Sequence, residues 1–186
     1  MGEPDHRSDR DLVERFRKGD REAFAALYRT HFPAVFRFAF YMTGDRIRAA
    51  EITQDVFVWL VHHPGGFDAR RGDLGAFLGG VARKFVRRER SRAQRWLPLL
   101  ESAAWSETDF AADLEREQEV AELRKAIAAL PERYREAVVL CDLNGGAYEE
   151  VAALLGCAVG TVRSRLHRAR GLLAKKFHCR KESQKC

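Results

Sequence analysis

The stretch 148–177 restricts the possible folds more than any other part of the chain. Gly156 divides it, and glycine takes the left-handed turn conformation at low cost. After this turn, apolar residues return at spacings of four, three and four, at Val162, Leu166, Ala169 and Leu173. This spacing places them on one stripe of a helix. The sequence therefore predicts a short helix, a tight turn and a second helix that packs through one face.

The other face of the second helix carries hydrogen-bond donors. At about 100° per residue, the residues that fall away from the apolar stripe are Arg163, Ser164, His167 and Arg168. A helix that packs through one face and offers donors on another suits the DNA major groove. A basic amphipathic helix is also typical of an ordinary solvated surface. This stretch alone leaves both interpretations open.

Apolar residues recur at helical spacing along the rest of the chain, and we expect an all-α fold. We predict helices over 11–19, from Arg21 through Pro33 (with a kink or break there), over 46–62 and over 74–95. Further helices are expected over 113–129 and from Pro131, because proline is favoured at the start of a helix. The expected architecture is two small helical domains joined by a flexible linker, the C-terminal one containing a helix-turn-helix.

The domain boundaries follow from where the helical period is lost. We place the first domain at 1–95, an acidic linker at 96–112, the second domain at 113–177 and a polar tail at 178–186. The tail is expected to be disordered, as chain ends often are.

Charge is distributed unevenly over these segments. The net charge is +6, but the basic residues concentrate in 83–95 and 163–185, whereas 101–122 carries eight acids against Arg116. This pattern indicates two anion-binding regions separated by a negative segment, and it favours a polyanionic partner.

Several classes of protein are disfavoured. Because the chain has no run of about 18 apolar residues and no apolar signal-peptide core, we expect a cytoplasmic protein without membrane insertion. Paired acids at metal-binding spacing, a phosphate-binding glycine loop and a nucleophile beside a base are all missing, so we expect no enzyme and no cofactor. The cysteines Cys141, Cys157, Cys179 and Cys186 form no CxxC pair, which argues against a metal site. A thiol or metal switch at Cys179 and Cys186 stays open.

Four stretches carry a resemblance: DLVERFRKGDREAFAALYRTHFPAVFRFA, RAAEITQDVF, FDARRGDLGAFLGGVARK, and LPERYREAVVL followed by NGGAYEEVAALLGCAVGTVRSRLHRARGLL. In order and spacing they resemble the extracytoplasmic-function (ECF) group of the sigma-70 family of RNA polymerase sigma factors. The similarity extends from Asp11 to Phe177. It implies an alternative sigma factor that binds core RNA polymerase and directs transcription initiation at promoters by reading −10 and −35 elements.

The resemblance implies three sets of site residues. Core polymerase, through the clamp helices of its largest subunit, would meet Glu51, Gln54 and Asp55. The −10 element would meet Phe67, Arg83, Lys84, Arg87 and Arg88. The −35 element would meet Thr161, Arg163, Ser164, Arg165, His167 and Arg168. Arg165 and the neighbouring Arg170 are better placed for phosphates. Phe67 is either a ring that stacks on an unstacked base or an anchor of its loop in the core.

Further partners follow from the same resemblance: the flap of the second-largest polymerase subunit, promoter DNA and an anti-sigma factor. The chain departs from the family pattern at Ala50, Phe77, Lys84 and the pair Gly79–Gly80. Each glycine inside a helix costs about 1 kcal/mol relative to alanine. A stand-alone helix-turn-helix regulator that binds an operator, usually as a dimer, is the alternative function.

Overall fold

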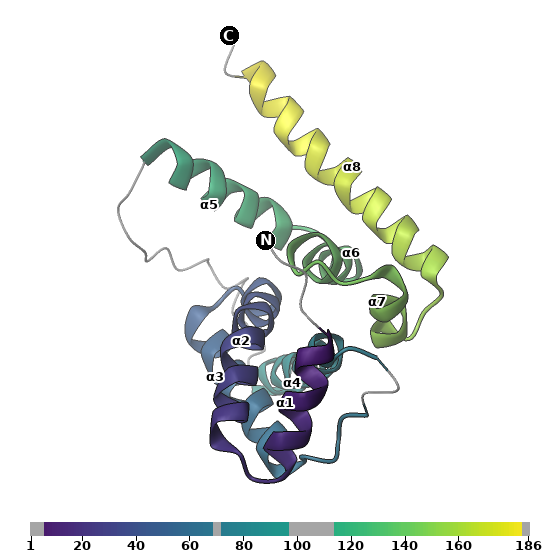
Figure 1. Ribbon diagram of the computed structural model, residues 1–186. Coiled ribbons are helices and arrows are strands. Elements are labelled where there is room, and N and C mark those ends of the chain that lie inside the picture. The colour runs from purple at the N-terminus through teal and green to yellow at the C-terminus, as the bar shows by residue number, and fades with distance from the viewer. Residues whose placement is uncertain (1–5, 69–71, 97–113, 184–186) are drawn as a thin grey trace.

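The computed structural model describes residues 6–68, 72–96 and 114–183, and within these ranges it consists of helices and their connections (Figure 1). The N-terminal half holds α1 (His6–Arg17), α2 (Arg21–Thr43), α3 (Arg46–His62) and α4 (Leu74–Trp96). The C-terminal half holds α5 (Leu114–Ala128), α6 (Glu132–Ala137), a π-helical turn η1 (Val138–Leu143), α7 (Tyr148–Leu155) and α8 (Val159–Ser183). The predicted all-α fold is confirmed for these residues.

Capping side chains decide where the N-terminal helices begin. One Asp20 oxygen accepts the backbone N–H groups of Glu22 and Ala23 at 2.9 and 3.1 Å. Asp45 caps α3 in the same way, which satisfies donors that have no partner inside the helix. Helix α2 runs through Pro33 without a break, so of the two expected alternatives, a kink or a break, the break is wrong.

The first core forms where α2 packs against α1, α3 and α4. Its largest fully buried side chains are Leu27, Phe38, Val56, Leu60, Leu74 and Leu78. Each lies on the inner stripe of its helix, which leaves the opposite faces free for other contacts.

The predicted helix-turn-helix is present in α7 and α8. Gly156 ends α7 with a φ of 67°, the left-handed conformation that glycine favours. Val162, Leu166 and Ala169 are buried as the spacing predicts, and Leu173 packs against the same core.

The C-terminal half differs from the expectation in two places. The residues after Ala137 form a π-helical turn, which helical periodicity does not reveal. In addition, α8 continues to Ser183, so the expected disorder is wrong for residues 178–183, while 184–186 lie outside the described residues. The physical reason is that neither proline nor glycine follows Gly171, while lysine, arginine and glutamate propagate a helix well. The predicted linker, except Trp96 at the end of α4, falls outside the described residues, as does residue 113.

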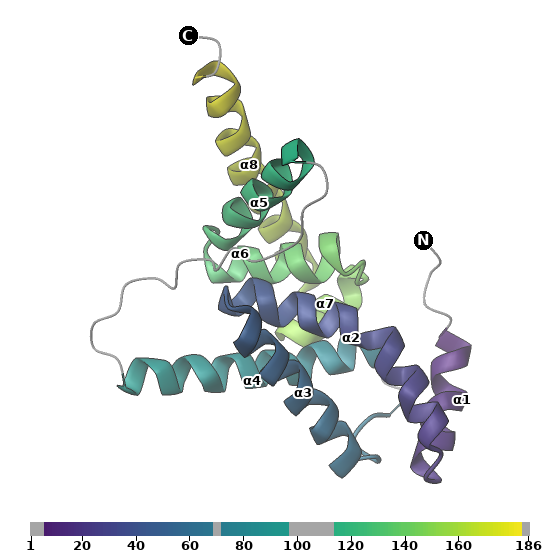
Figure 2. The same ribbon diagram turned by 90° about the vertical axis from the view of Figure 1, so that its left-hand side faces the viewer.

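The two helical regions pack directly on one another. Helix α7 lies against α4, and α6 and η1 lie against α2 (Figures 1 and 2). The buried apolar residues of both halves form one continuous cluster. The long basic α8 leaves this cluster and extends away from it (Figure 2).

Shortening a core side chain of α2 should destabilise the protein. Leu27 is fully buried, so Leu27→Ala should lower the free energy of unfolding by about 2–5 kcal/mol, because it removes apolar contacts and leaves a cavity. Urea denaturation followed by circular dichroism measures this change. Ile47, which is 73% exposed, is the matched control, and Ile47→Ala should change the stability by less than about 0.5 kcal/mol.

Candidate nucleic-acid interface

The outward face of α8 presents a row of polar side chains. Arg163, Ser164, His167 and Arg168 are exposed, whereas Thr161 and Arg165 are partly buried. The Ser164 hydroxyl donates to the Thr161 carbonyl at 2.9 Å. The buried stripe on the opposite side packs the helix against the core, so this face is open to solvent.

Two arginines of α8 have partners inside the protein. Arg170 forms a two-point ion pair with Asp142, with nitrogen–oxygen distances of 3.1 and 2.6 Å, and this carboxylate raises the pKa of Arg170. A hydrogen bond with the Tyr134 hydroxyl raises the pKa of Arg168 and lowers that of the tyrosine. Arg170, predicted to contact phosphate, is therefore held by η1, while Arg168 leans toward α6.

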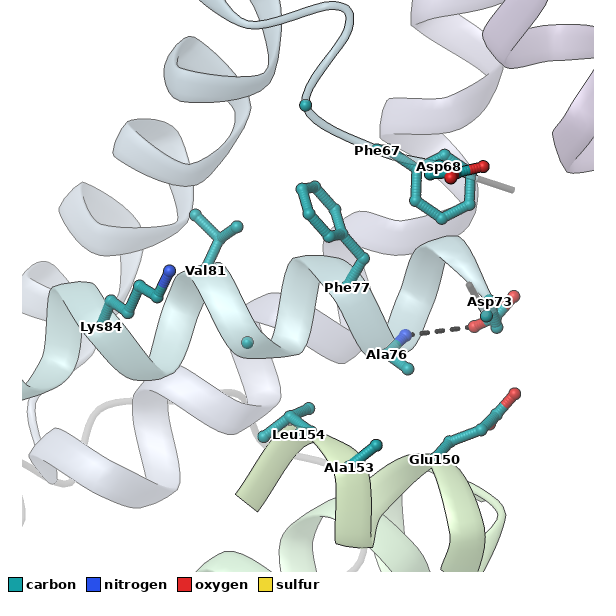
Figure 3. Close-up of a pocket in the computed structure, with 13 residues that line it drawn as sticks. Phe67, Asp68, Asp73, Ala76, Phe77, Val81, Lys84, Glu150, Ala153 and Leu154 are labelled. Carbon is teal, nitrogen blue, oxygen red and sulfur yellow. Dashed lines mark hydrogen bonds between the residues drawn. The ribbon is translucent and has the colours of Figure 1, made fainter. Parts of the chain in front are cut away.

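The loop between α3 and α4 is fastened to the core by Phe67. This side chain is 4% exposed, and its ring lies 5.5 Å from that of Phe77 (Figure 3). Arg17 of α1 donates to the Pro64 carbonyl at 2.8 Å and also to the Phe67 carbonyl. The structure thus gives Phe67 the position of a loop anchor.

A pocket of about 340 Å³ lies beside this loop. One wall comes from α4 and includes Phe77, Val81 and Lys84 (Figure 3). The opposite wall comes from α7 and consists of Glu150, Ala153 and Leu154 (Figure 3). The pocket is therefore shared between the two helical regions.

A second cavity, of about 370 Å³, gathers arginines from both regions; its lining includes Arg83, Arg87, Arg133 and Arg165. Arg83 is not free, because its Nε lies 2.6 Å from Glu136 Oε1 and its second nitrogen 3.3 Å from Oε2. Glu136 is only 3% exposed. Lys84, Arg87 and Arg88 are exposed. The structure thus brings residues of the predicted −10 and −35 sets to one cavity.

The outward face of α3 combines acids with apolar residues. Glu51, Gln54 and Asp55 are exposed as expected. Val58 and Val61, each 46% exposed, continue the same face one and two turns later. The sequence reasoning missed both valines, although Val58 and Val61 follow Gln54 by about one and two helical turns, which places them on its face.

Sequence reasoning also missed Arg17 and Glu136. Arg17 holds the loop through backbone carbonyls 47 and 50 residues away, and no local pattern indicates this. The sequence does give an indication for Glu136, because this acid directly precedes the apolar run AVVL, and a buried acid needs a partner.

No metal site emerges from the described residues, which contain no group of three or more His, Cys, Asp or Glu side chains able to hold an ion. Burial raises the pKa of Cys141 to about 11, so this thiol stays protonated. Cys186 and the side chain of Cys179 lie outside the described part. None of the helices described is long and apolar enough to cross a bilayer.

Comparison with known proteins agrees with this division into two regions. The family model described as "Sigma-70 region 2" matches residues 27–96, and "Sigma-70, region 4" matches residues 121–173. The RNA polymerase sigma-H factor of Pseudomonas aeruginosa is 30% identical over 181 residues, which cover 90% of this chain and 92% of that protein. The ECF RNA polymerase sigma-E factor of Escherichia coli K12 is also 30% identical, over 88% of this chain and 91% of that protein.

The chain belongs to the ECF group of the sigma-70 family. Members of this family are transcription-initiation factors and not enzymes. The ECF sigma factor SigE of Mycolicibacterium smegmatis is 33% identical over 161 residues, and the match spans 82% of this chain but 62% of that relative's length. Matches to two separate sigma regions argue against a stand-alone operator-binding regulator.

Solved structures resemble this ECF sigma factor in fold. RpoE of Bartonella quintana, solved in complex with the anti-sigma factor NepR, has a TM-score of 0.71 at 26% identity, over 83% of this chain and 96% of that one. CnrH, solved with the cytosolic domain of CnrY, also has a TM-score of 0.71, over 92% of this chain and 98% of that chain, but at 24% identity it supports the fold alone.

The buried position of Phe67 can be tested without DNA. If the ring anchors the loop, Phe67→Ala should lower the free energy of unfolding by about 3 kcal/mol, since buried aromatic truncations typically cost about 3–5 kcal/mol. Chemical denaturation of the free protein measures this loss. Lys84→Ala, at an exposed residue of the same pocket, is the control and should leave stability unchanged. An unchanged stability of Phe67→Ala would contradict the anchoring role.

Proposed function

We propose that this ECF sigma factor divides promoter-specific initiation among three surfaces: the outward face of α3, the −10 face on α4 and its loop, and the donor face of α8. The observation that carries this proposal is the separation of packing and polar faces on α3 and α8. Each helix packs through one stripe and leaves an opposite face open to a partner.

The donor face of α8 is proposed to read the −35 element. Arginine can bond to guanine O6 and N7 together, and each good pair discriminates against a wrong base by about 1–3 kcal/mol. Arg163 and His167 are exposed and suit base edges. Thr161 stands near the helix N-terminus, whose free N–H groups attract phosphate. Ser164, Arg165 and Arg168 complete this surface.

The −10 element is assigned to α4 and the loop before it. Lys84, Arg87 and Arg88 are exposed cations in successive turns, suited to the backbone of a melted strand. Arg83 joins them once Glu136 releases it. An unstacked base would enter the pocket beside Phe77, with Phe67 holding the loop behind it. Unstacking costs a few kcal/mol, which such a pocket must offset.

The outward face of α3 is assigned to core RNA polymerase. Glu51, Gln54 and Asp55 would meet basic residues of the clamp helices, and Val58 and Val61 would add apolar contact area. Exposed valines beside acids suit an interface whose centre is apolar and whose rim is charged. The flap of the second-largest subunit is the proposed contact of the C-terminal region.

Regulation and location are also proposals. RpoE of Bartonella quintana was solved with an anti-sigma factor, and its likeness to this chain supports control by a protein of that kind. We propose that the factor acts in the cytoplasm, where polymerase and promoters are found.

Reconstitution tests the function directly. Purified protein mixed with core polymerase and promoters selected from random DNA should give transcripts from defined start sites. Specific duplex binding without core, together with no transcription when core is added, would instead favour a stand-alone regulator.

Removing arginines from the donor face of α8 should weaken promoter use but not polymerase binding. Arg163→Ala and Arg168→Ala should each reduce transcription about 5- to 150-fold, the equivalent of about 1–3 kcal/mol. Run-off transcription and a core-binding assay measure the two effects separately. Lys175→Ala, at an exposed cation further along α8, is the control. Loss of core binding by either arginine variant would argue against this division of roles.

Changes on the outward face of α3 should weaken the binding of core polymerase, which the α8 variants should leave unchanged. Asp55→Arg should lower the affinity for core polymerase at least about tenfold, because it places a cation against basic clamp residues and truncated or repelled charge pairs cost about 2–5 kcal/mol. Fluorescence anisotropy with labelled protein measures this affinity. Glu14→Arg makes the same charge change on α1, at another exposed residue, and should bind core normally.

A further inference from the structure

The loop segment 63–68, which follows α3, is held by side chains of two different helices. The first is Trp59 of α3, whose ring stacks on that of His63, with centroids 4.4 Å apart and planes 10° from parallel. A Cβ added to Gly66 would lie 2.8 Å from Cη2 of this tryptophan and 3.1 Å from the His63 carbonyl oxygen. The backbone at Gly66 therefore lies so close to the indole ring that a side chain does not fit there.

The second side chain is Arg17, the last residue of α1. Its Nε donates to the Pro64 carbonyl at 2.8 Å, and its Nη2 donates to the Phe67 carbonyl. A guanidinium is a planar fork of N–H donors, so binding both carbonyls fixes their directions relative to each other. The Phe67 carbonyl belongs to the peptide unit that leads to Asp68, which lines the pocket (Figure 3). Arg17 thus orients the loop where it reaches the pocket.

Helix α1 is itself fixed at its other end. Asp9 Oδ2 lies 2.9 Å from His31 Nε2 of α2, and the two side chains are only 8% and 6% exposed. A Cβ added to Gly75, in the first turn of α4, would lie 3.4 Å from Nδ1 of the same histidine. Helix α1 is therefore anchored beside the start of α4 and holds the loop segment with its last residue.

An exposed arginine near DNA can also serve as a phosphate ligand, and this role has different requirements. A phosphate contact needs a positive charge and carries no sequence information. A bridge between two carbonyls needs two N–H groups in a fixed geometry, which lysine does not provide. Since two nitrogens of Arg17 already bind loop carbonyls, the geometry favours the bridge.

We propose that Arg17 and Trp59 form a clamp that orders the loop segment 63–68 in advance for base selection in the −10 element. Both are positioning residues, because they act through the loop. A loop that is already ordered adds no ordering cost when a base enters the pocket, where unstacking must be offset. Helix α1 thereby contributes to promoter selectivity. This role in base selection rests on the proposed function, whereas the clamp itself does not.

Substitutions of Arg17 test one half of the clamp. Arg17→Ala removes both hydrogen bonds to the loop, and Arg17→Lys keeps the charge but loses the bridge. The matched control is Lys18→Ala, because Lys18 is the exposed cation that directly follows Arg17.

A substitution in the loop tests the other half. Gly66→Ala places a methyl group against the Trp59 ring, while Gly65→Ala is the matched control, because an added Cβ at Gly65 has nothing within 4 Å. Circular dichroism melting curves verify that all five variants are folded.

Hydrogen exchange of the free protein measures the clamp without DNA or polymerase. In the wild type the Gly66 N–H donates to the His63 carbonyl at 2.9 Å, which protects it. Arg17→Ala, Arg17→Lys and Gly66→Ala should speed exchange of the backbone amides in 63–68 at least about fivefold. Both controls should exchange at the wild-type rate. Unchanged exchange in all three folded test variants would overturn the clamp.

Transcription with core polymerase measures base selection. The templates are promoters selected from random DNA and copies with single substitutions in the −10 element. The three test variants should reduce the preference for the selected −10 bases at least about tenfold. Their preference at the −35 element and their affinity for core should match the wild type, as should all three properties of the controls.

Three transcription results would overturn the positioning role. They are a normal −10 preference despite faster loop exchange, a loss of core binding by the test variants, and full rescue by Arg17→Lys with equally weakened use of every template by Arg17→Ala, which indicates a phosphate contact. Faster loop exchange in the test variants, together with a wild type that never initiates with core, would support the clamp and count against the proposed function alone.

Discussion

The buried ion pair between Arg83 and Glu136 connects the two halves of this sigma factor. Taking two charges out of water costs several kcal/mol each, and only good geometry offsets that cost. The two nitrogen–oxygen contacts, at 2.6 and 3.3 Å, meet this condition. Because an isolated Glu136 at 3% exposure would be very unfavourable, α6 must lie where Arg83 can reach it. This requirement orients the C-terminal region relative to α4.

The functional surfaces lie where a helix packs through one face and leaves another face for a partner. Helices α3 and α8 each use one stripe for the core, and their remaining faces carry acids and valines in one case and donors in the other. Helix α4 differs, because its outward face both packs against the C-terminal region and carries the residues proposed to bind the −10 element. That is why its glycines, its pocket and Arg83 all contact α6 or α7, while Lys84, Arg87 and Arg88 remain exposed.

Local signals predicted much of the fold. The turn at Gly156 placed the helix-turn-helix correctly, because a left-handed glycine acts within a few residues. Long-range features could not be predicted: Arg83 and Glu136 are 53 residues apart in sequence, and only packing brings them together. The role of Phe67 could not be predicted either, because an aromatic side chain in a loop can stack on a base or pack into a core. Its position depends on the surrounding helices. The contacts of the exposed residues with DNA and with core polymerase remain predictions.

The length of α8 has a mechanical consequence. At ~1.5 Å per residue, its 25 residues form a rod of about 37 Å that begins just after the Gly156 turn. A rotation of about 10° at that turn moves the far end of the rod by roughly 6 Å, but moves residues 163–168 by only about 1–2 Å. The side chains that face DNA lie close to the pivot. A small rotation at the turn therefore changes the positions of these side chains on the bases only slightly. Most of the displacement occurs in the distal half of the helix.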